Sequence, residues 1–277
     1  MMDAATLRML QLEELDMAKQ ILAICEKHDI EVFALGGTLL GAVRHQGFIP
    51  WDDDLDLGMK RADYERFIKL APSELHAPLS LHTCYNDKAF LYPYVRVQNA
   101  DYGLQRDFTT DKTVQDLWVD IFPLDGVPAD GLRRTLWETA LTALRGLRNL
   151  SAFNALVNVE KSYSGLKGAV FEVGRRTGIQ KLLPTNVFLR AIDRILKAFP
   201  VEGEACIGNP MGGHWFHEVF PAGVYDAVVE LPFEDIELPC PAEYETILRT
   251  MYGDYMVLPP EEQRNWHGTT LVRSPEK

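Results

Sequence analysis

Four carboxylates fall within five positions near the start of this sequence. Asp52, Asp53 and Asp54 are consecutive, and Asp56 follows after a single residue, Leu55. Such a cluster of like charges repels itself unless a cation neutralises it. If Leu55 points into a core, the two-residue period of a strand places Asp54 and Asp56 together on the opposite face. The spacing therefore predicts a metal-binding edge with Asp54 and Asp56 as ligands.

A glycine turn lies upstream of this acidic run. The largely apolar stretch 31–35 predicts a short strand, Gly36 and Gly37 end it, and Thr38 is a candidate cap for a helix over 38–44. A helix N-terminus after a glycine turn can bind phosphate, because backbone N–H groups and the helix dipole face the anion. The sequence thus predicts a phosphate ester held between amides and a divalent cation. A tight turn followed by an acidic surface loop is the alternative.

The same residues resemble the signature of a known family. The segments GTLLGAVRH at 37–45 and GFIPWDDDLD at 47–56 closely resemble the LicD family, whose relatives include fukutin and fukutin-related protein. These proteins belong to the nucleotidyltransferase-fold superfamily. The resemblance implies transfer of a phospho-alcohol, commonly phosphocholine, from a CDP-activated donor to a glycan.

Composition limits the class of protein. The chain has 277 residues, and its hydrophobic content of 47% is typical of a globular protein. Its formal net charge of −12 at pH 7 argues against a nucleic-acid binder, which would need a basic surface. Its N-terminus has charged residues within the first turns, so we expect no signal peptide, and no apolar run is long enough to span a membrane. We expect a cytoplasmic protein.

The order of apolar and turn-forming segments predicts an α+β fold. Together with the resemblance, it indicates a nucleotidyltransferase-like mixed β-sheet core flanked by helices. We expect helices over 6–28, 63–70 and 244–251, strands over 79–84, 91–97 and 114–122, and a hairpin over 229–240.

A further carboxylate, Asp120, stands alone between Val119 and Ile121. A lone buried acid is costly unless it is paired or bound to metal. Two-metal phosphoryl-transfer sites need a further carboxylate, and a DIFPLD segment like the one at 120–125 recurs in LicD-like proteins. We therefore expect Asp120 to complete the metal site and to accept the proton of the attacking hydroxyl. Arg96, in a predicted apolar strand, is expected to bind an anion.

The segment 132–198 differs from the rest of the chain in its charge. It contains twelve Lys and Arg against four acids, a net charge of +8, and its apolar residues follow helical spacing. A basic helical insertion of this kind could contact an anionic membrane surface or a lipid-linked glycan, and a solvated basic face is the alternative. We predict a catalytic core at 1–131, the insertion at 132–198, and a part at 199–277 that completes the core.

The C-terminal tail also resembles LicD proteins. Those chains close with a Tyr-Gly-Asp-Tyr segment, as at 252–255, then a Pro-Pro pair, as at 259–260, and a nearby Arg and His. The matching positions here are Arg264 and His267, which the resemblance marks as donor-binding candidates.

These features together predict a metal-dependent transferase of the LicD type. It would use Mg²⁺ or Mn²⁺, a CDP-alcohol donor with CDP-choline favoured, and a cell-surface glycan or lipid-linked acceptor, with 132–198 as a candidate contact to the inner membrane face. The predicted roles are metal binding by Asp54, Asp56 and Asp120, stabilisation of the leaving nucleotide by Arg44, and donor binding by Gly36, Gly37, Thr38, His45, Arg96, Arg264 and His267. A nucleotidyltransferase that uses an NTP, or a non-catalytic nucleotide- or glycan-binding subunit, remains an alternative.

Overall fold

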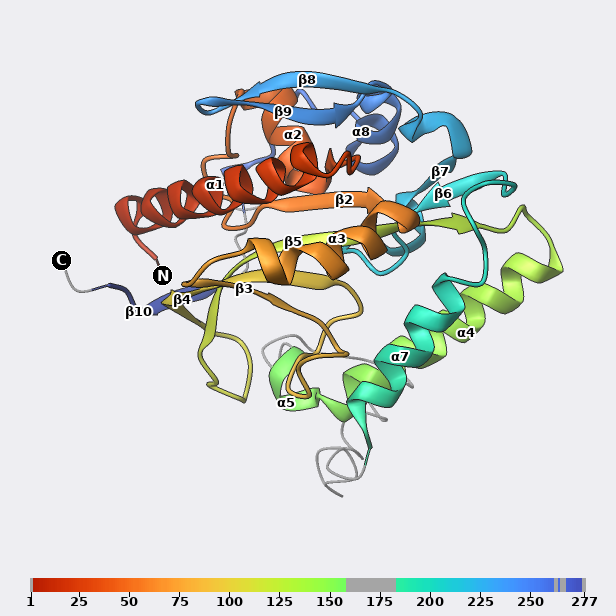
Figure 1. The fold of residues 1–277 in the computed structure, drawn as a ribbon, viewed down its shortest axis with the longest axis horizontal. Helices are drawn as coiled ribbons and strands as arrows, with labels where there is room; N and C mark the ends of the chain where they lie inside the picture. Colours follow the sequence, from red (N-terminus) through yellow and green to blue (C-terminus); the bar gives the residue numbers. More distant parts are fainter. Residues whose placement is uncertain (1, 158–182, 262–263, 265–267, 276–277) are drawn as a thin grey trace.

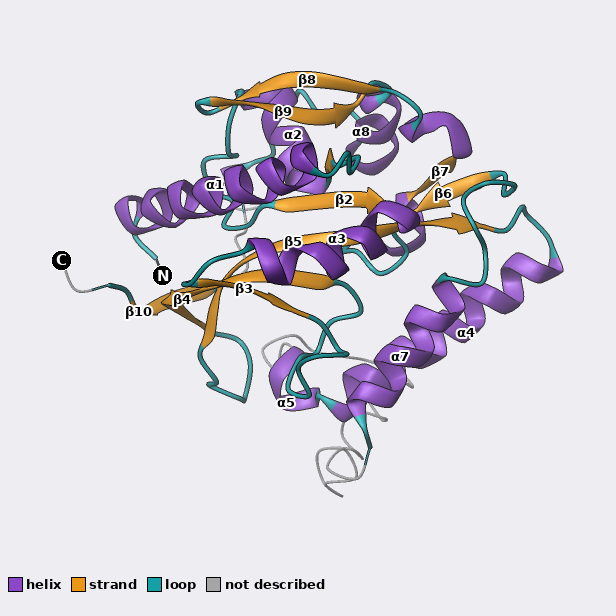
Figure 2. Cartoon of the chain, in the orientation of Figure 1, coloured by secondary structure: helices purple, strands orange, loops and turns teal. Residues whose placement is uncertain are grey.

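The computed structural model describes residues 2–157, 183–261, 264 and 268–275, and has the α+β architecture predicted from the sequence (Figures 1 and 2). In this part of the chain, eight strands form one sheet. Its central path is β1 (Phe33–Ala34), β2 (Asp56–Lys60), β5 (Gln115–Val127), β4 (Val95–Arg106) and β10 (Thr269–Arg273). Three further strands join this path, β3 (Leu79–His82) on β4, β6 (Cys206–Gly208) on β5, and β7 (Val219–Pro221) on β6.

The sheet is mixed, because β2 and β5 run parallel while the other described pairs run antiparallel. The parallel pair sets the position of the acidic run. Asp56, the first residue of β2, lies in register with Asp120 of β5, and Asp120 lies in register with Arg96 of β4. Neighbours in register point to the same face of a sheet, so these three residues form one row across it.

Two helices cover part of the sheet. α1 (Ala4–Lys27) and α3 (Arg61–Glu74) contact each other and both contact β5. α1 begins where Asp3 caps it by accepting hydrogen bonds from the N–H groups of Ala5 and Thr6. It buries an apolar stripe at helical spacing that includes Ala18 and Ile21. α2 (Gly36–His45) follows β1 directly and leads into the acidic run.

Two predicted element boundaries were wrong at prolines. α3 continues through Pro72 to Glu74 instead of ending before it. Pro72 has no N–H for a hydrogen bond to the preceding turn, and the helix ends two residues after it. β4 begins at Val95 rather than Leu91, since Pro93 has no N–H to donate to a neighbouring strand. The strand predicted over 114–122 extends as β5 to Val127.

The described helices of the basic segment pack together at one end of the sheet (Figure 1). α4 (Leu132–Ser151) lies beside α7 (Thr185–Leu196), and α5 (Phe153–Leu156) follows α4. A cluster of buried apolar side chains from α4, α7, β5 and the loop after β6 joins them: Val127, Trp137, Leu141, Ile192, Leu196 and Met211. The domain boundaries at 131 and 198 stay predictions.

The C-terminal part adds the predicted hairpin and helix. The hairpin is β8 (Val228–Phe233) with β9 (Ile236–Pro241), and α8 (Tyr244–Tyr252) ends at Gly253, whose φ is +67°. A positive φ at this position is typical of a glycine that ends a helix. Two short 3₁₀ helices, η2 (Trp215–Glu218) and η3 (Ala222–Tyr225), precede the hairpin. None of the described helices is long and apolar enough to cross a membrane.

Candidate active site

A cavity of about 460 Å³ opens where α2 begins. Its lining combines the start of α2, the acidic run, β5, the loop after β6, and the end of α8. The described lining residues that carry the argument below are Gly36, Gly37, Asp52, Asp54, Asp56, Phe122, Asn209, Gly212, His214, Glu218 and Tyr252. The structure therefore brings together two predicted metal ligands and the two predicted phosphate-binding glycines.

The glycines are required where α2 meets the acidic run. Gly36 has a φ of +51°, and a Cβ there would lie 3.4 Å from Asp56 Oδ2. A Cβ on Gly37 would clash with Asp52 Oδ2. Both carboxylates thus lie directly against the first turn of α2, whose N–H groups have no helical partner.

Thr38 links this helix to the acidic strand. The predicted cap was wrong, because α2 begins at Gly36 with Leu35 as its N-cap, and Thr38 lies inside the first turn. Its buried hydroxyl accepts a hydrogen bond of 2.8 Å from the N–H of Asp56. Thr38 therefore fixes the start of β2, and its predicted contact with phosphate stays a prediction.

Two neighbouring elements hold the acidic loop. The side-chain amide of Gln11 in α1 donates to the carbonyl oxygen of Asp52 at 2.8 Å. From the other side, Thr269 of β10 donates through Oγ1 to Asp53 Oδ2 at 2.7 Å. Asp53 is buried. Its hydrogen bond with Thr269 therefore fixes the acidic loop at the position between Asp52 and Asp54.

Asp120 lies beside Asp56 in the sheet but makes an ion pair with Arg96. The Nε and Nη2 atoms of Arg96 donate to the two carboxylate oxygens of Asp120 at 2.5 and 3.1 Å. The guanidinium also lies 3.7 Å from the ring centroid of Tyr92 and 4.2 Å from that of Trp118. Burial alone would lower the pKa of Arg96, but Asp120 raises it. The anion expected at Arg96 is therefore Asp120, and the metal and proton-accepting roles of Asp120 stay predictions.

The cavity carries concentrated negative charge. The pKa of Glu14, buried in α1, lies well above its usual value because of burial and then of the nearby aspartates. Burial, followed by Glu218 and the aspartates, also raises the pKa of Tyr252. Asp54 and Asp56 fit a hard cation, since Mg²⁺ uses one or two carboxylates and completes its shell with water and substrate phosphate. Among the described residues, no three His, Cys, Asp or Glu side chains are grouped closely enough to hold a metal by themselves.

Glu218 is a candidate functional residue that the sequence interpretation missed. Its carboxylate accepts hydrogen bonds from the N–H of His214 at 2.8 Å and from Asn209 Nδ2 at 3.1 Å. Burial raises its pKa to about 7, against the opposing effect of these hydrogen bonds and of Arg145. The sequence feature that could have pointed to Glu218 is the glycine-rich loop before it. Gly212 of this loop lies so close to the carboxylate that a Cβ there would clash with it.

Three other predicted residues gather at the far end of α2. Arg44 lies about 12 Å along the helix axis from Gly36, and its Nη1 donates to the carbonyl oxygen of Tyr255 at 2.7 Å. The guanidinium of Arg264 lies 4.5 Å from the ring centroid of Trp51, and the ring of His45 lies 6.1 Å from it, edge to face. None of the three lines the acidic cavity in the described structure. His267 lies outside the described residues.

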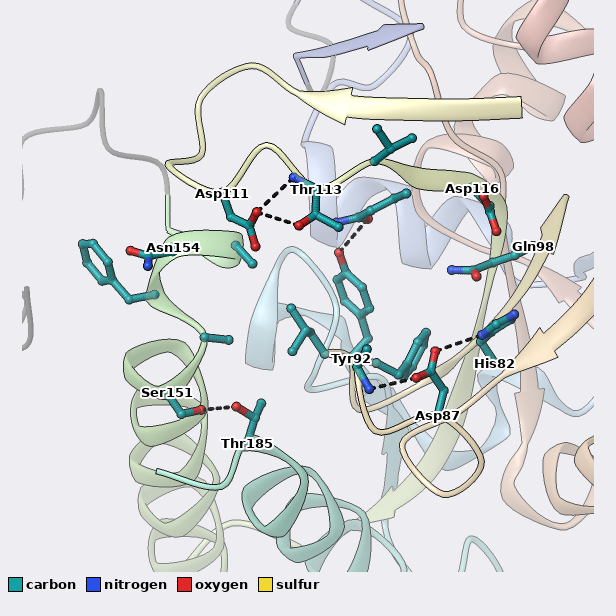
Figure 3. Close-up of a pocket in the computed structure, with 18 residues that line it drawn as sticks. His82, Asp87, Tyr92, Gln98, Asp111, Thr113, Asp116, Ser151, Asn154 and Thr185 are labelled. Atoms are coloured by element: carbon teal, nitrogen blue, oxygen red, sulfur yellow. Dashed lines mark hydrogen bonds and ion pairs between the residues drawn. The ribbon is translucent and has the colours of Figure 1, made fainter. Parts of the chain in front are cut away.

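A second cavity, of about 550 Å³, lies near the end of α4 and shares no lining residue with the acidic one (Figure 3). Its polar side chains pair with one another: His82 with Asp87, Asp111 with Thr113, and Ser151 with Thr185 (Figure 3). Its lining includes the carboxylates of Asp87, Asp111 and Asp116, the first two of which are held by these neighbouring side chains.

Comparison with known proteins agrees with this arrangement. Residues 29–137 match the family model described as LicD/FKTN/FKRP, nucleotidyltransferase domain. The chain is 28% identical over 276 residues to the lipopolysaccharide cholinephosphotransferase LicD of Haemophilus influenzae, which covers 96% of this chain and 97% of that protein. It is 29% identical over 112 residues to the human ribitol 5-phosphate transferase FKRP, covering 40% of this chain and 21% of FKRP. An uncharacterized protein of Rickettsia typhi is 52% identical over 46 residues, 17% of this chain and 15% of that protein. Residues 29–137 of this chain therefore match a nucleotidyltransferase domain of the LicD/FKTN/FKRP type, and the chain is similar to LicD over nearly its whole length.

Proposed function

We propose that this protein is a metal-dependent transferase that moves a phospho-alcohol from a CDP-activated donor to a sugar hydroxyl of a glycan. Its two named relatives are a cholinephosphotransferase and a ribitol 5-phosphate transferase, which supports an enzyme of this type. Phosphocholine is the favoured group, because the similarity to the cholinephosphotransferase extends over 97% of that protein.

The observation that carries the proposal is the acidic cavity at the start of α2. Asp54 and Asp56 line it together with Gly36 and Gly37. In the proposed complex, the two carboxylates hold Mg²⁺ or Mn²⁺, and the amides of the glycine turn receive a donor phosphate. The cation, when bound, would neutralise charge on the donor pyrophosphate and on the leaving nucleotide. Asp120 is a proposed third ligand only if Arg96 releases one of its oxygens.

Glu218 is the proposed proton acceptor. It lines the same cavity as Asp54 and Asp56 and accepts hydrogen bonds from neutral groups, whereas Asp120 is ion-paired with Arg96 and does not line this cavity. In the proposed step, the acceptor hydroxyl oxygen forms a bond to the phosphorus that carries the alcohol, and its proton passes to Glu218. The bond from this phosphorus to the bridging oxygen breaks, and CMP leaves with the electron pair. A general base with a pKa near the working pH is well suited to this role.

Donor identity can be tested by thermal unfolding. A ligand that binds only the folded state raises the melting temperature. We expect CDP-choline with Mg²⁺ or Mn²⁺ to raise it more than CDP-ribitol, CDP-glycerol, CDP-ethanolamine, CTP or ATP, and EDTA to remove the effect. Stabilisation by CTP or ATP alone would contradict the proposal.

The released product separates the proposed reaction from its alternative. Incubation with CDP-choline and a glycan extract should release CMP, because the bond to the bridging oxygen breaks on the side of the transferred phosphorus. Pyrophosphate released from an NTP would instead indicate nucleotidyl transfer. Nucleotide binding with no product of either kind would indicate a non-catalytic subunit.

A further inference from the structure

A smaller hollow of about 260 Å³ adjoins the acidic cavity. Phe122, Gly212 and Gly213 line both, so the two spaces meet at these residues. Unlike the acidic cavity, this one is lined by three arginines, Arg106 from β4 and Arg145 and Arg148 from α4. We call the space bounded by these arginines, Tyr94 and Phe122 the arginine hollow.

The two arginines of α4 share one side of that helix, because they are three residues apart. Arg145 Nη1 donates to the carbonyl oxygen of Gly212 at 3.4 Å, and its guanidinium lies 3.8 Å from the ring centroid of Trp215. Arg148 Nε donates to the carbonyl oxygen of Leu91 at 2.8 Å. Neutral groups and aromatic rings thus hold both side chains in place.

The positive charge of the arginine hollow is costly to maintain. Burial, and then the neighbouring Arg148, lowers the pKa of Arg145 to about 10. Burial also lowers the pKa of Arg148, although nearby tyrosines oppose this effect. Arg106 adds a buried Nε that has no hydrogen-bond partner among the described residues. Arg96, which is paired with Asp120, shows the opposite behaviour, and this contrast indicates that the hollow is suited to an anion that comes from outside the chain.

We propose that the arginine hollow binds an acidic substituent, a phosphate or a carboxylate, on the acceptor glycan, while the accepting hydroxyl enters the acidic cavity. The assignment to the acceptor rests on the proposed function, which places the donor pyrophosphate at Asp54, Asp56 and the glycine turn. A cation held by Asp54 and Asp56 would neutralise that pyrophosphate, which leaves the arginines of the adjoining hollow for a second anion. Tyr92 lines the hollow and also the second cavity (Figure 3), which provides a polar and aromatic surface for further sugar units.

The test uses anionic sugar probes in the absence of metal. Glucose 6-phosphate and glucuronate are titrated into the full chain in EDTA at constant ionic strength, with glucose as the neutral comparison, and binding is measured by calorimetry. We expect saturable binding of at least one anionic sugar and none of glucose. Arg148→Gln should weaken this binding about tenfold, since one charge-assisted interaction is lost, and Arg148→Lys should weaken it less.

Arg133→Gln is the matched control, because Arg133 lies on the same helix with an exposed side chain and pairs with Glu204. It should bind the probes like the unaltered protein. Arg145→Gln provides a second variant if Arg148→Gln does not fold. Binding that is unchanged in both variants, or absent from the unaltered protein, would overturn the proposal.

A second titration separates the two possible sources of the anion. CDP-choline with Mn²⁺ should bind Arg148→Gln within about threefold of its affinity for the unaltered protein, because the donor lies elsewhere. If Arg148→Gln loses CDP-choline binding and keeps sugar binding, the hollow belongs to the donor and the assignment fails. If no CDP-alcohol binds any form while the anionic sugars still require Arg148, the anion site stands and the proposed function fails.

Discussion

At the scale of single residues, Asp54 and Asp56 should be essential for turnover and dispensable for folding. Both line the acidic cavity, in a region where burial, and then the neighbouring carboxylates, raise the pKa of Glu14 and Tyr252. Replacing either aspartate by alanine removes a proposed metal ligand and relieves repulsion. We expect CMP release from CDP-choline to fall at least about 100-fold, with a melting temperature equal to or above that of the unaltered protein.

The control for these variants is Asp16→Ala on α1, whose exposed carboxylate pairs with Lys19. It changes the net charge equally and should leave CMP release unchanged. The metal assignment would be contradicted if the double variant, with both Asp54→Ala and Asp56→Ala, retained turnover.

Glu218 should determine how the rate depends on pH. Burial raises its pKa to about 7, so its carboxylate is protonated and unable to accept a proton at lower pH. We expect kcat to fall as the pH drops below about 7 and to reach a plateau above it. Charged or titratable groups near Glu218 that can modify this profile are His214, Arg145, Tyr225 and Tyr252.

Glu218→Gln should lower kcat by about 100- to 10,000-fold and abolish this pH dependence, as measured by CMP release between pH 5.5 and 8.5. Glu230→Gln, at an exposed position in β8, is the control and should keep the profile. An unchanged pH profile in Glu218→Gln would exclude it as the proton acceptor.

Sequence reasoning found part of the site, for a physical reason. Asp54, Asp56, Gly36 and Gly37 are close in sequence, so a strand period and a helix start are enough to bring them together. Glu218 reaches the same cavity only through the pairing of β6 with β5 and β7. The glycine-rich loop before Glu218 is a local signal, but it does not indicate which strands this segment joins.

At the scale of elements, the Arg96–Asp120 pair joins β4 to β5 next to the acidic strand. Removing one partner leaves a buried charge without compensation, which costs about 3–5 kcal/mol. We expect Arg96→Met to lower the free energy of unfolding by about that amount in urea titrations. A double variant with Asp120→Leu should recover much of the loss, because apolar side chains replace both charges. A loss below about 1 kcal/mol in Arg96→Met would show that the pair does not stabilise this junction.

The role of Asp120 in turnover can be separated from this structural role. Asp120→Asn should be assayed per folded molecule, with the folded fraction taken from the unfolding curve. A loss of more than about 100-fold would support a metal ligand that Arg96 releases. A loss below about tenfold would assign Asp120 to positioning Asp56 through the sheet.

Element types were easier to predict than element ends. The hairpin at β8 and β9 and helix α8 lie where turn-forming residues and Gly253 place them, because these signals are local. The ends of α3 and β4 were harder to predict, because each lies near a proline. α3 continues two residues past Pro72, whereas β4 begins two residues after Pro93. The sequence also indicated the positive charge of 132–198. Only the contacts of α4 with Leu91 and with the loop after β6 place Arg148 and Arg145 next to the acidic cavity.

At the scale of the whole molecule, the acidic loop is held by both ends of the chain. Gln11 of α1 binds the backbone of Asp52, and Thr269 of β10 binds the side chain of Asp53. The active-site geometry therefore depends on a C-terminal strand that pairs with β4, far from the signature in sequence. This arrangement gives the tail a structural role in addition to the donor contacts predicted for it.

Thr269→Val tests this coupling with little change of shape. The valine keeps the volume of the buried side chain but cannot donate to Asp53 Oδ2, and loss of a hydrogen bond to a charged group costs about 1.5–3 kcal/mol. We expect that decrease in the free energy of unfolding and a several-fold higher KM for CDP-choline, because Asp53 lies between Asp52 and Asp54. Thr270→Val is the matched control, since its hydroxyl binds Asp107 at an exposed site, and it should change stability by less than about 0.5 kcal/mol. Equal effects of the two variants on KM would show that the tail does not position the acidic loop.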